Sequence, residues 1–236
     1  MIKNRFLAVL RMHYLNFLTS MLWFWLILLS VFLLNLLFVI FFAPDNMNGP
    51  RMNFGSVMAV FLYMLISGFV TLKDSFGYTI GMSITRKEYY LATVLAFLAA
   101  AACNTLLTFL LHAAEKGINS LLQVNFYFFS SFYQLGHAAL MLWIHFFIQV
   151  LLVTLSFVYS CYHYKYGKTA LFTTLAGFLL VMMLFSVLDL WRSLFHLLGM
   201  FDSFGQFTLW CVPLVILLYI IGWFAVRKMN IRPAAG

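Results

Sequence analysis

Histidines and uncharged polar residues are the side chains of this sequence that could do chemistry, and most of them fall in long apolar runs. His137 and His145 are eight residues apart, which brings them near one face of a helix. No carboxylate lies in the same run, and two histidines without a third ligand are weak evidence for a metal site. The pair is more typical of hydrogen bonding between helices, so we expect neither a metal nor another cofactor.

Motifs of hydrolytic enzymes are absent from the chain. Neither G-x-S-x-G nor H-E-x-x-H occurs. Gly167-Lys168-Thr169 is similar to the end of a P-loop, but the full pattern requires glycine where this chain has Tyr162. We therefore expect no enzymatic activity and no ATP binding in this chain. If ATP drives the protein, a partner subunit binds it.

The composition excludes a water-soluble domain. Hydrophobic residues make up 65% of the 236 residues and charged residues only 8%, with a mean hydropathy of +1.00. A soluble domain is roughly half apolar and about a quarter charged. The chain is therefore predicted to be an all-α membrane protein whose residues 1–236 form a single transmembrane domain embedded in the lipid bilayer.

Charge-free runs place the transmembrane helices, because a span needs roughly 20 apolar residues to cross a core of about 30 Å. The six predicted spans are about 20–42, 54–72, 91–112, 136–160, 169–188 and 207–226. The polar and aromatic segment 117–135 is interpreted as interfacial. A short amphipathic helix on the outer surface is predicted over 189–206.

Basic residues are divided unequally between the two sides that these spans create. Eleven lie on the side that holds both termini, and three, Arg51, Lys116 and Arg192, lie on the other. The positive-inside rule places the first side in the cytoplasm. Both termini are therefore predicted to be cytoplasmic in a multi-pass protein of the cell membrane. Topology and lipid headgroups account for the net charge of +8 without a nucleic-acid partner.

The N-terminal segment 1–18 is basic and mildly amphipathic. Ile2, Phe6 and Val9 share one helical face, while Lys3 and Arg11 lie on another. This pattern predicts an interfacial helix before the first span. A plain extension of that span is the alternative.

The cytoplasmic loop 73–90 contains a helix-start signal. Thr85-Arg86-Lys87-Glu88 is a capping box, in which the N-cap Thr85 and Glu88 each accept the other's backbone N–H. An apolar run follows directly. The third span is therefore predicted to begin at Arg86.

Upstream of the capping box, apolar residues recur every four positions at Phe76, Ile80 and Ile84. Gly77 and Gly81 share this spacing and would expose backbone for close packing. The pattern predicts a short helix along the cytoplasmic surface, suited to docking a partner. An ordinary connector with two glycines is the alternative.

Asn35, Asn104 and Gln149 are polar side chains within predicted spans. They favour hydrogen bonds between helices, worth about 0.6 kcal/mol each on average. The alternative is that they line a pathway across the membrane. Charged residues are absent from the spans, whereas ion-coupled carriers usually need them. Any active transport should therefore draw its energy from elsewhere.

Residues 81–90 carry a resemblance to a known family. Their sequence, Gly-Met-Ser-Ile-Thr-Arg-Lys-Glu-Tyr-Tyr, resembles the G-x-S-R-K-E-aromatic stretch between the second and third spans of ABC-2 type transporter permeases. Here Ile84 and Thr85 separate Ser83 from Arg86, which is a departure in spacing. The ending 223–228 is also similar to the family's last span running into a basic tail. With the six-span layout, the resemblance covers nearly the whole chain.

The resemblance implies a membrane subunit that docks on a separate ATPase subunit through the loop after its second span. It also implies a dimer with an identical or sister permease, export of peptides, antimicrobials or drugs, and a bacterial plasma membrane. The residues expected to contact the ATPase are Tyr78, Met82, Arg86, Lys87 and Glu88. The alternative function is a non-transporting membrane protein, such as a sensor, an assembly factor or an immunity protein.

Overall fold

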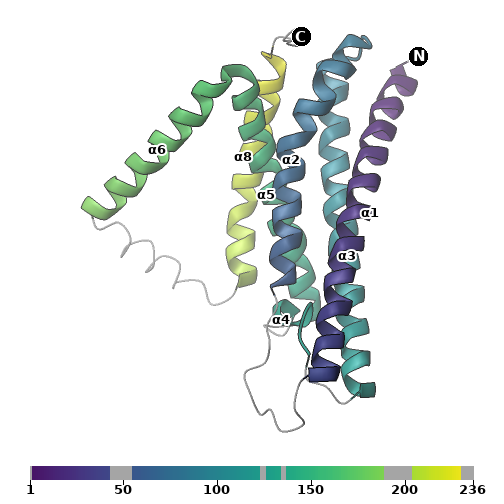
Figure 1. The fold of residues 1–236 in the computed structure, drawn as a ribbon. Helices are drawn as coiled ribbons and strands as arrows, with labels where there is room; N and C mark the ends of the chain where they lie inside the picture. Colours follow the sequence, from purple (N-terminus) through teal and green to yellow (C-terminus); the bar gives the residue numbers. More distant parts are fainter. Residues whose placement is uncertain (1, 43–54, 123–125, 134–136, 189–203, 230–236) are drawn as a thin grey trace.

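The computed structural model describes residues 2–42, 55–122, 126–133, 137–188 and 204–229, and its regular structure there is helical (Figure 1). The helices are α1 (Ile2–Phe42), α2 (Ser56–Gly81), α3 (Arg86–Leu122), α4 (Ser130–Tyr133), α5 (Ala138–Tyr166), α6 (Lys168–Val187) and α8 (Phe204–Arg227). Five of them, α1, α2, α3, α5 and α6, are long and apolar enough to cross a membrane. The chain is thus an all-α, multi-pass membrane protein.

The sixth predicted span corresponds to α8. Within it, Val212–Arg227 forms a shorter apolar helix than the roughly 20 residues that a span needs. The sixth crossing therefore stays a prediction. The outer amphipathic helix predicted over 189–206 falls mostly on residues 189–203, which lie outside the described residues.

The N-terminal segment is continuous with the first span. α1 is one helix of 41 residues, which corresponds to about 60 Å, roughly twice the thickness of a bilayer core. Its helical structure has no break between the predicted interfacial segment 1–18 and the predicted span 20–42. The structure thus has one continuous helix over both predicted segments, and the part of it that lies in the interface stays a prediction.

The predicted docking helix is not a separate element, which corrects that expectation. α2 runs without interruption from Ser56 to Gly81, so residues 76–81 are its last turns. The apolar run ends at the exposed Lys73 and Asp74, but charges on an exposed face do not end a helix. Phe76 and Thr79 stay buried on the other face, and this packing keeps the helix intact.

The described residues of 117–135, predicted to form one interfacial segment, belong to two different parts of the structure. Residues up to Leu122 belong to α3, and residues 126–133 fold back to pack on it and on α1. The aromatic side chains of this segment explain the reversal, since Phe126, Phe128 and Phe129 are buried around Phe32 of α1.

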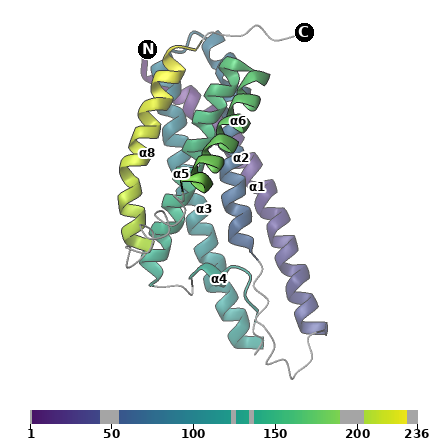
Figure 2. The ribbon, with the colours of Figure 1, turned by 90° about the vertical axis from the view of Figure 1, so that its left-hand side faces the viewer.

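The bundle core lies where α5 packs against α2, α3 and α8, while α1 packs mainly on α3. Aromatic residues from several helices fill it, among them Phe76, Tyr89, Phe97 and Phe157. α6 diverges from this bundle (Figure 1), and in the view turned by 90° it lies in front of the bundle (Figure 2). Ala170, next to the connection with α5, is the one buried residue of α6.

One end of the bundle holds the start of α1, the end of α8 and the short connections α2–α3 and α5–α6 (Figure 1). Gly167 makes the second connection with a positive φ of 63°, which glycine adopts without strain. Among the Lys and Arg residues of the described ranges, Lys116 alone lies toward the opposite end of the bundle. We call the first end the basic end.

Candidate functional site

The connection between α2 and α3 is a compact turn at the basic end, formed by residues 82–85. Backbone N–H groups of Met82, Ser83 and Ile84 donate to carbonyls in the last turn of α2. Ser83 adopts a positive φ of 58°, which is uncommon for a residue with a side chain. We call this turn, together with the last two turns of α2 and the first turn of α3, the elbow.

The capping box forms as the sequence predicts. The Glu88 carboxylate accepts from the Thr85 backbone N–H at 3.0 Å and from the Thr85 hydroxyl at 2.7 Å, while the Glu88 N–H donates to that hydroxyl at 3.3 Å. α3 begins at Arg86, which confirms the predicted start of the third helix. The elbow therefore has a defined shape set by its own residues.

Two arginines connect the elbow to the ends of the chain. The Arg5 guanidinium on α1 donates to the Ser83 carbonyl at 3.4 Å. The Arg86 guanidinium donates to the Arg227 carbonyl at the end of α8. The elbow is thereby hydrogen-bonded directly to α1 and α8.

Buried hydrogen bonds lie directly beneath the elbow. The Tyr89 and Ser75 hydroxyls pair at 2.9 Å, joining α3 to α2. The Thr93 hydroxyl lies 3.0 Å from Nε2 of His13, joining α3 to α1. Tyr89 and His13 are almost completely buried. These contacts were not predicted from the sequence, because they join residues up to 80 positions apart.

The five residues expected to contact an ATPase separate into two groups. Tyr78 and Met82 are 62% and 56% exposed, and Lys87 is also exposed. Arg86 and Glu88 instead hydrogen-bond within the chain, to α8 and to Thr85. The structure thus leaves Tyr78, Met82 and Lys87 as the side chains that present an open surface.

The two elbow glycines add open backbone to the exposed face of α2. A Cβ atom added at Gly77 or Gly81 would meet nothing within 4 Å. Both glycines neighbour Tyr78 or Met82 along the helix. A partner could therefore approach the α2 backbone closely on this face, and we call Gly77, Tyr78, Gly81 and Met82 the elbow face.

A largely apolar groove that carries several hydroxyls lies between α1 and α2, with a volume of about 800 Å³. One wall carries hydroxyls one helical turn apart, from Tyr63, Ser67, Thr71 and Ser75. Ser67, Thr71 and Ser75 each donate to the carbonyl four residues earlier. The other wall includes His13, Asn16, Thr19 and Ser20 of α1, and Asp74 also lines the groove. Sequence reasoning missed it, although the four-residue spacing of the hydroxyls was a usable signal.

Asn35, Asn104 and Gln149, the three residues that could have lined a pathway, do not line this groove. Asn104 is fully buried and accepts from the Trp25 indole N–H at 2.9 Å. Gln149 is fully buried and donates to the Thr105 hydroxyl at 3.0 Å. Asn35 donates to the Val31 carbonyl of its own helix at 2.7 Å. The contacts of Asn104 and Gln149 match the interpretation of hydrogen bonds between helices.

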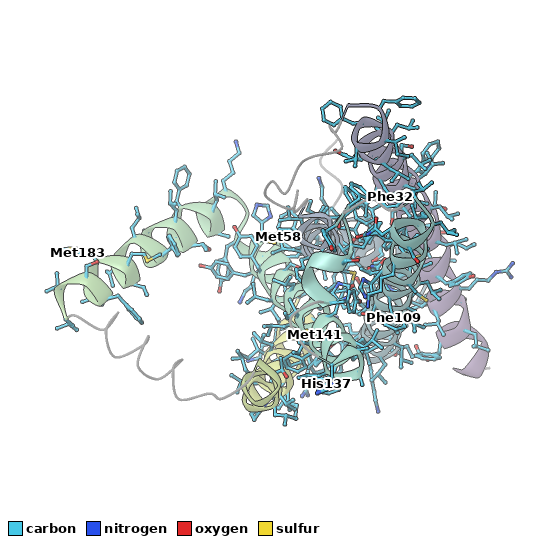
Figure 3. The ribbon with its side chains drawn as sticks, turned by 90° about the horizontal axis from the view of Figure 1, so that it is seen from below. Phe32, Met58, Phe109, His137, Met141 and Met183 are labelled. Atoms are coloured by element: carbon cyan, nitrogen blue, oxygen red, sulfur yellow. The ribbon has the colours of Figure 1, made fainter. Side chains whose placement is uncertain are left out.

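His112, His137 and His145 lie toward the end opposite the basic end, where Figure 3 labels His137. His145 is 3.2 Å from the Tyr133 hydroxyl, and His112 is 2.9 Å from the Ser130 hydroxyl. His137 precedes α5 as its N-cap residue. No cluster of three or more His, Cys, Asp or Glu side chains suited to a metal ion occurs among the described residues. The contacts of His112 and His145 join separate segments of the chain.

Glu115 is a buried acidic residue of α3, just beyond the predicted third span 91–112. It has no exposed surface and accepts the backbone N–H groups of Phe128 at 3.0 Å and Phe129 at 2.6 Å. Asn119, one turn later, accepts from and donates to the backbone of Phe126. Both side chains thus hold the returning segment 126–133 against α3.

Comparison with protein-family models, with curated proteins and with solved structures finds no match for this chain.

Proposed function

We propose that this chain is the membrane-spanning permease subunit of an ABC-2 type transporter, driven by a separate ATPase subunit. The observation that carries the proposal is the elbow face. It presents an exposed tyrosine, an exposed methionine and two open glycines at the basic end, with Lys87 nearby. Aromatic and methionine side chains are enriched at protein interfaces.

The elbow is also suited to transmit motion. On this proposal, ATP binding closes the ATPase subunits and displaces the elbow. Arg5 and Arg86 then carry the displacement to α1 and α8, while Tyr89 carries it to the α2–α3 contact beneath. A paired permease subunit, identical or a sister chain, completes the transporter.

The groove between α1 and α2 supports transport over a non-transporting role. The Ser67 and Thr71 hydroxyls on its α2 wall donate to α2 carbonyls and keep lone pairs that can accept a hydrogen bond from a solute. α1 and α2 have few contacts with each other, so widening the groove would break the Ser20–Tyr63 hydrogen bond and the Phe24–Tyr63 stacking but not the core between α2 and α5. Export of peptides, antimicrobials or drugs along this groove remains part of the proposal.

The elbow face is tested by co-purification. Tagged full-length chain is isolated in mild detergent from cells that make it naturally, and the eluate is assayed for a P-loop ATPase and for vanadate-sensitive ATP hydrolysis. We expect Tyr78→Ala with Met82→Ala to reduce the recovered ATPase by roughly tenfold or more, because exposed anchors at interfaces contribute about 2 kcal/mol each.

The matched control is Tyr14→Ala with Met58→Ala. These side chains are 59% and 62% exposed but lie away from the elbow. They should leave ATPase recovery unchanged. If the wild-type chain never co-purifies with an ATPase, or if both double variants behave alike, the coupling role is wrong and a sensor, assembly or immunity function becomes the better proposal.

A further inference from the structure

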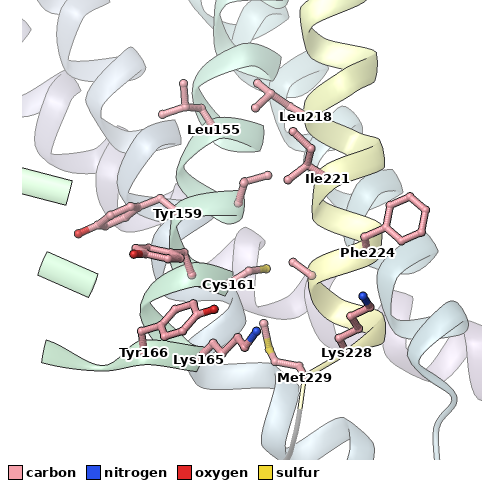
Figure 4. Close-up of a pocket in the computed structure, with 13 residues that line it drawn as sticks. Leu155, Tyr159, Cys161, Lys165, Tyr166, Leu218, Ile221, Phe224, Lys228 and Met229 are labelled. Carbon is pink, nitrogen blue, oxygen red and sulfur yellow. The ribbon is translucent and has the colours of Figure 1, made fainter. Parts of the chain in front are cut away.

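A second groove lies between α5 and α8 at the basic end (Figure 4). Its volume is about 500 Å³, within the range of ligand pockets. Leu155 and Leu218 lie at one end of it, and Lys165 and Lys228 lie at the other. Apolar groove residues such as Ile221 and Phe224 are 44% and 52% exposed, so the groove is open along its side.

The basic end of this groove has the chemistry of a headgroup site. Lys165 and Lys228 are both exposed, and no acidic residue occurs among the thirteen residues that line the groove. Three tyrosines, Tyr159, Tyr162 and Tyr166, lie beside the lysines. The Lys165 ammonium is 4.9 Å from the centre of the Tyr166 ring. Tyrosine is enriched where the membrane meets water, and basic pockets between transmembrane helices bind anionic headgroups.

The groove has the depth of one membrane leaflet. Lys165 and Leu155 are ten residues apart on α5, and Lys228, the residue directly after α8, is ten residues from Leu218. Ten helical residues correspond to about 15 Å, which is half of a hydrocarbon core of about 30 Å. A molecule with an anionic head and an apolar tail of one leaflet's length therefore matches both walls.

We propose that this groove binds an anionic glycerophospholipid. The phosphate lies at Lys165 and Lys228, and an acyl chain follows the groove past Ile221 toward Leu155 and Leu218. The bound lipid fills the space between α5 and α8 at the point where α6 leaves the bundle. The proposal does not depend on transport or on an ATPase partner.

The test measures lipid binding to the purified full-length chain. Native mass spectrometry records adducts of dioleoyl-phosphatidylglycerol and dioleoyl-phosphatidylcholine at equal concentrations. Lys165→Gln with Lys228→Gln should weaken phosphatidylglycerol binding by about 30-fold, because each basic residue near an anionic surface contributes about fivefold. Phosphatidylcholine binding should change little.

The matched control removes the same charge elsewhere at the basic end. Lys73→Gln with Lys87→Gln changes two exposed lysines that do not line the groove, and it should preserve the phosphatidylglycerol preference. Equal losses in the two double variants would show diffuse attraction and would overturn the site.

A steric variant tests the tail independently of charge. Ile221→Trp fills the open side of the groove and should reduce adducts of both lipids. Inorganic phosphate at millimolar concentration should not displace phosphatidylglycerol from the wild-type chain. Displacement by phosphate, together with an Ile221→Trp variant that binds lipid normally, would show a free phosphate site and would refute the lipid proposal.

Discussion

Arg86 and Lys87 are adjacent basic residues whose surroundings give them different roles. Arg86 donates to the last carbonyl of α8, where a cation also complements the negative end of the helix dipole. Lys87 is exposed. The resemblance to ABC-2 type permeases implies that both residues contact a partner subunit, but of the two only Lys87 has an exposed side chain.

Substitution should separate these roles. Arg86→Ala is expected to lower the free energy of unfolding by about 1.5–3 kcal/mol, because it removes a charged hydrogen bond between α3 and α8. Lys87→Ala is expected to change stability by less than about 0.5 kcal/mol. Thermal unfolding in one detergent measures both effects. Equal stabilities of the two variants would contradict the assigned contact.

Glu115 provides a second test at the scale of a single residue. Glu115→Ala leaves the N–H groups of Phe128 and Phe129 without their acceptor, at a cost of about 1–3 kcal/mol for each buried unpaired group. Glu115→Gln keeps one acceptor oxygen but sets an NH2 donor against the second N–H, so it should also destabilise the fold. The measurement is thermal unfolding, and a glutamine variant as stable as the wild-type chain would argue against acceptance of both N–H groups by this side chain.

At the scale of elements, α2 and α5 form the most extensive helix contact, and Gly68 allows their close approach. A Cβ atom at this position would overlap the Ser156 hydroxyl and the Val153 carbonyl oxygen. Ser160 adds a hydrogen bond from α5 to the Phe69 carbonyl at 2.7 Å. Small residues at helix interfaces in membranes permit such backbone proximity.

The two glycines at positions 68 and 77 should therefore respond differently to the same substitution. Gly68→Ala is expected to destabilise the bundle by about 1–3 kcal/mol through overpacking against α5. Gly77→Ala meets open space and should be neutral or slightly stabilising, since alanine favours helix. Thermal unfolding of both variants tests this contrast. A Gly68→Ala variant as stable as the wild-type chain would show that α2 and α5 are farther apart than in this structure.

At the scale of the whole molecule, the bundle has two chemically different ends. The basic end holds the elbow, the start of α1, the end of α8 and ten of the eleven Lys and Arg residues in the described ranges. Lys116 lies toward the other end. The positive-inside rule then predicts that the basic end faces the cytoplasm.

Cysteine labelling tests this orientation with two matched glycines. Gly81 is at the basic end and Gly117 toward the opposite end, and a Cβ atom at either meets nothing within 4 Å. In a background without native cysteines, Gly117→Cys should react with an impermeant maleimide on intact cells. Gly81→Cys should react only after the membrane is opened. The reverse pattern would invert the topology.

Much of the element layout could be predicted from the sequence, because apolar run length and capping are local properties. The composition shows a membrane protein, and the start of α3 at Arg86 follows from one capping box. The predicted spans 20–42 and 54–72 were too short, because α1 begins at Ile2 and α2 ends at Gly81. Charges such as Lys73 mark the end of an apolar run, but the helix continues wherever its other face stays packed.

Composition and spacing along the chain are enough to show that lipid surrounds this protein, roughly where its apolar helices lie and how unevenly its charge is distributed. The tertiary structure alone decided what each polar residue does: Arg86 contacts α8, Asn104 contacts Trp25, and Tyr78 remains exposed. The physical reason is that hydropathy sums over neighbours in the chain. A side chain's partners depend on how each helix is rotated and on which distant helix lies beside it.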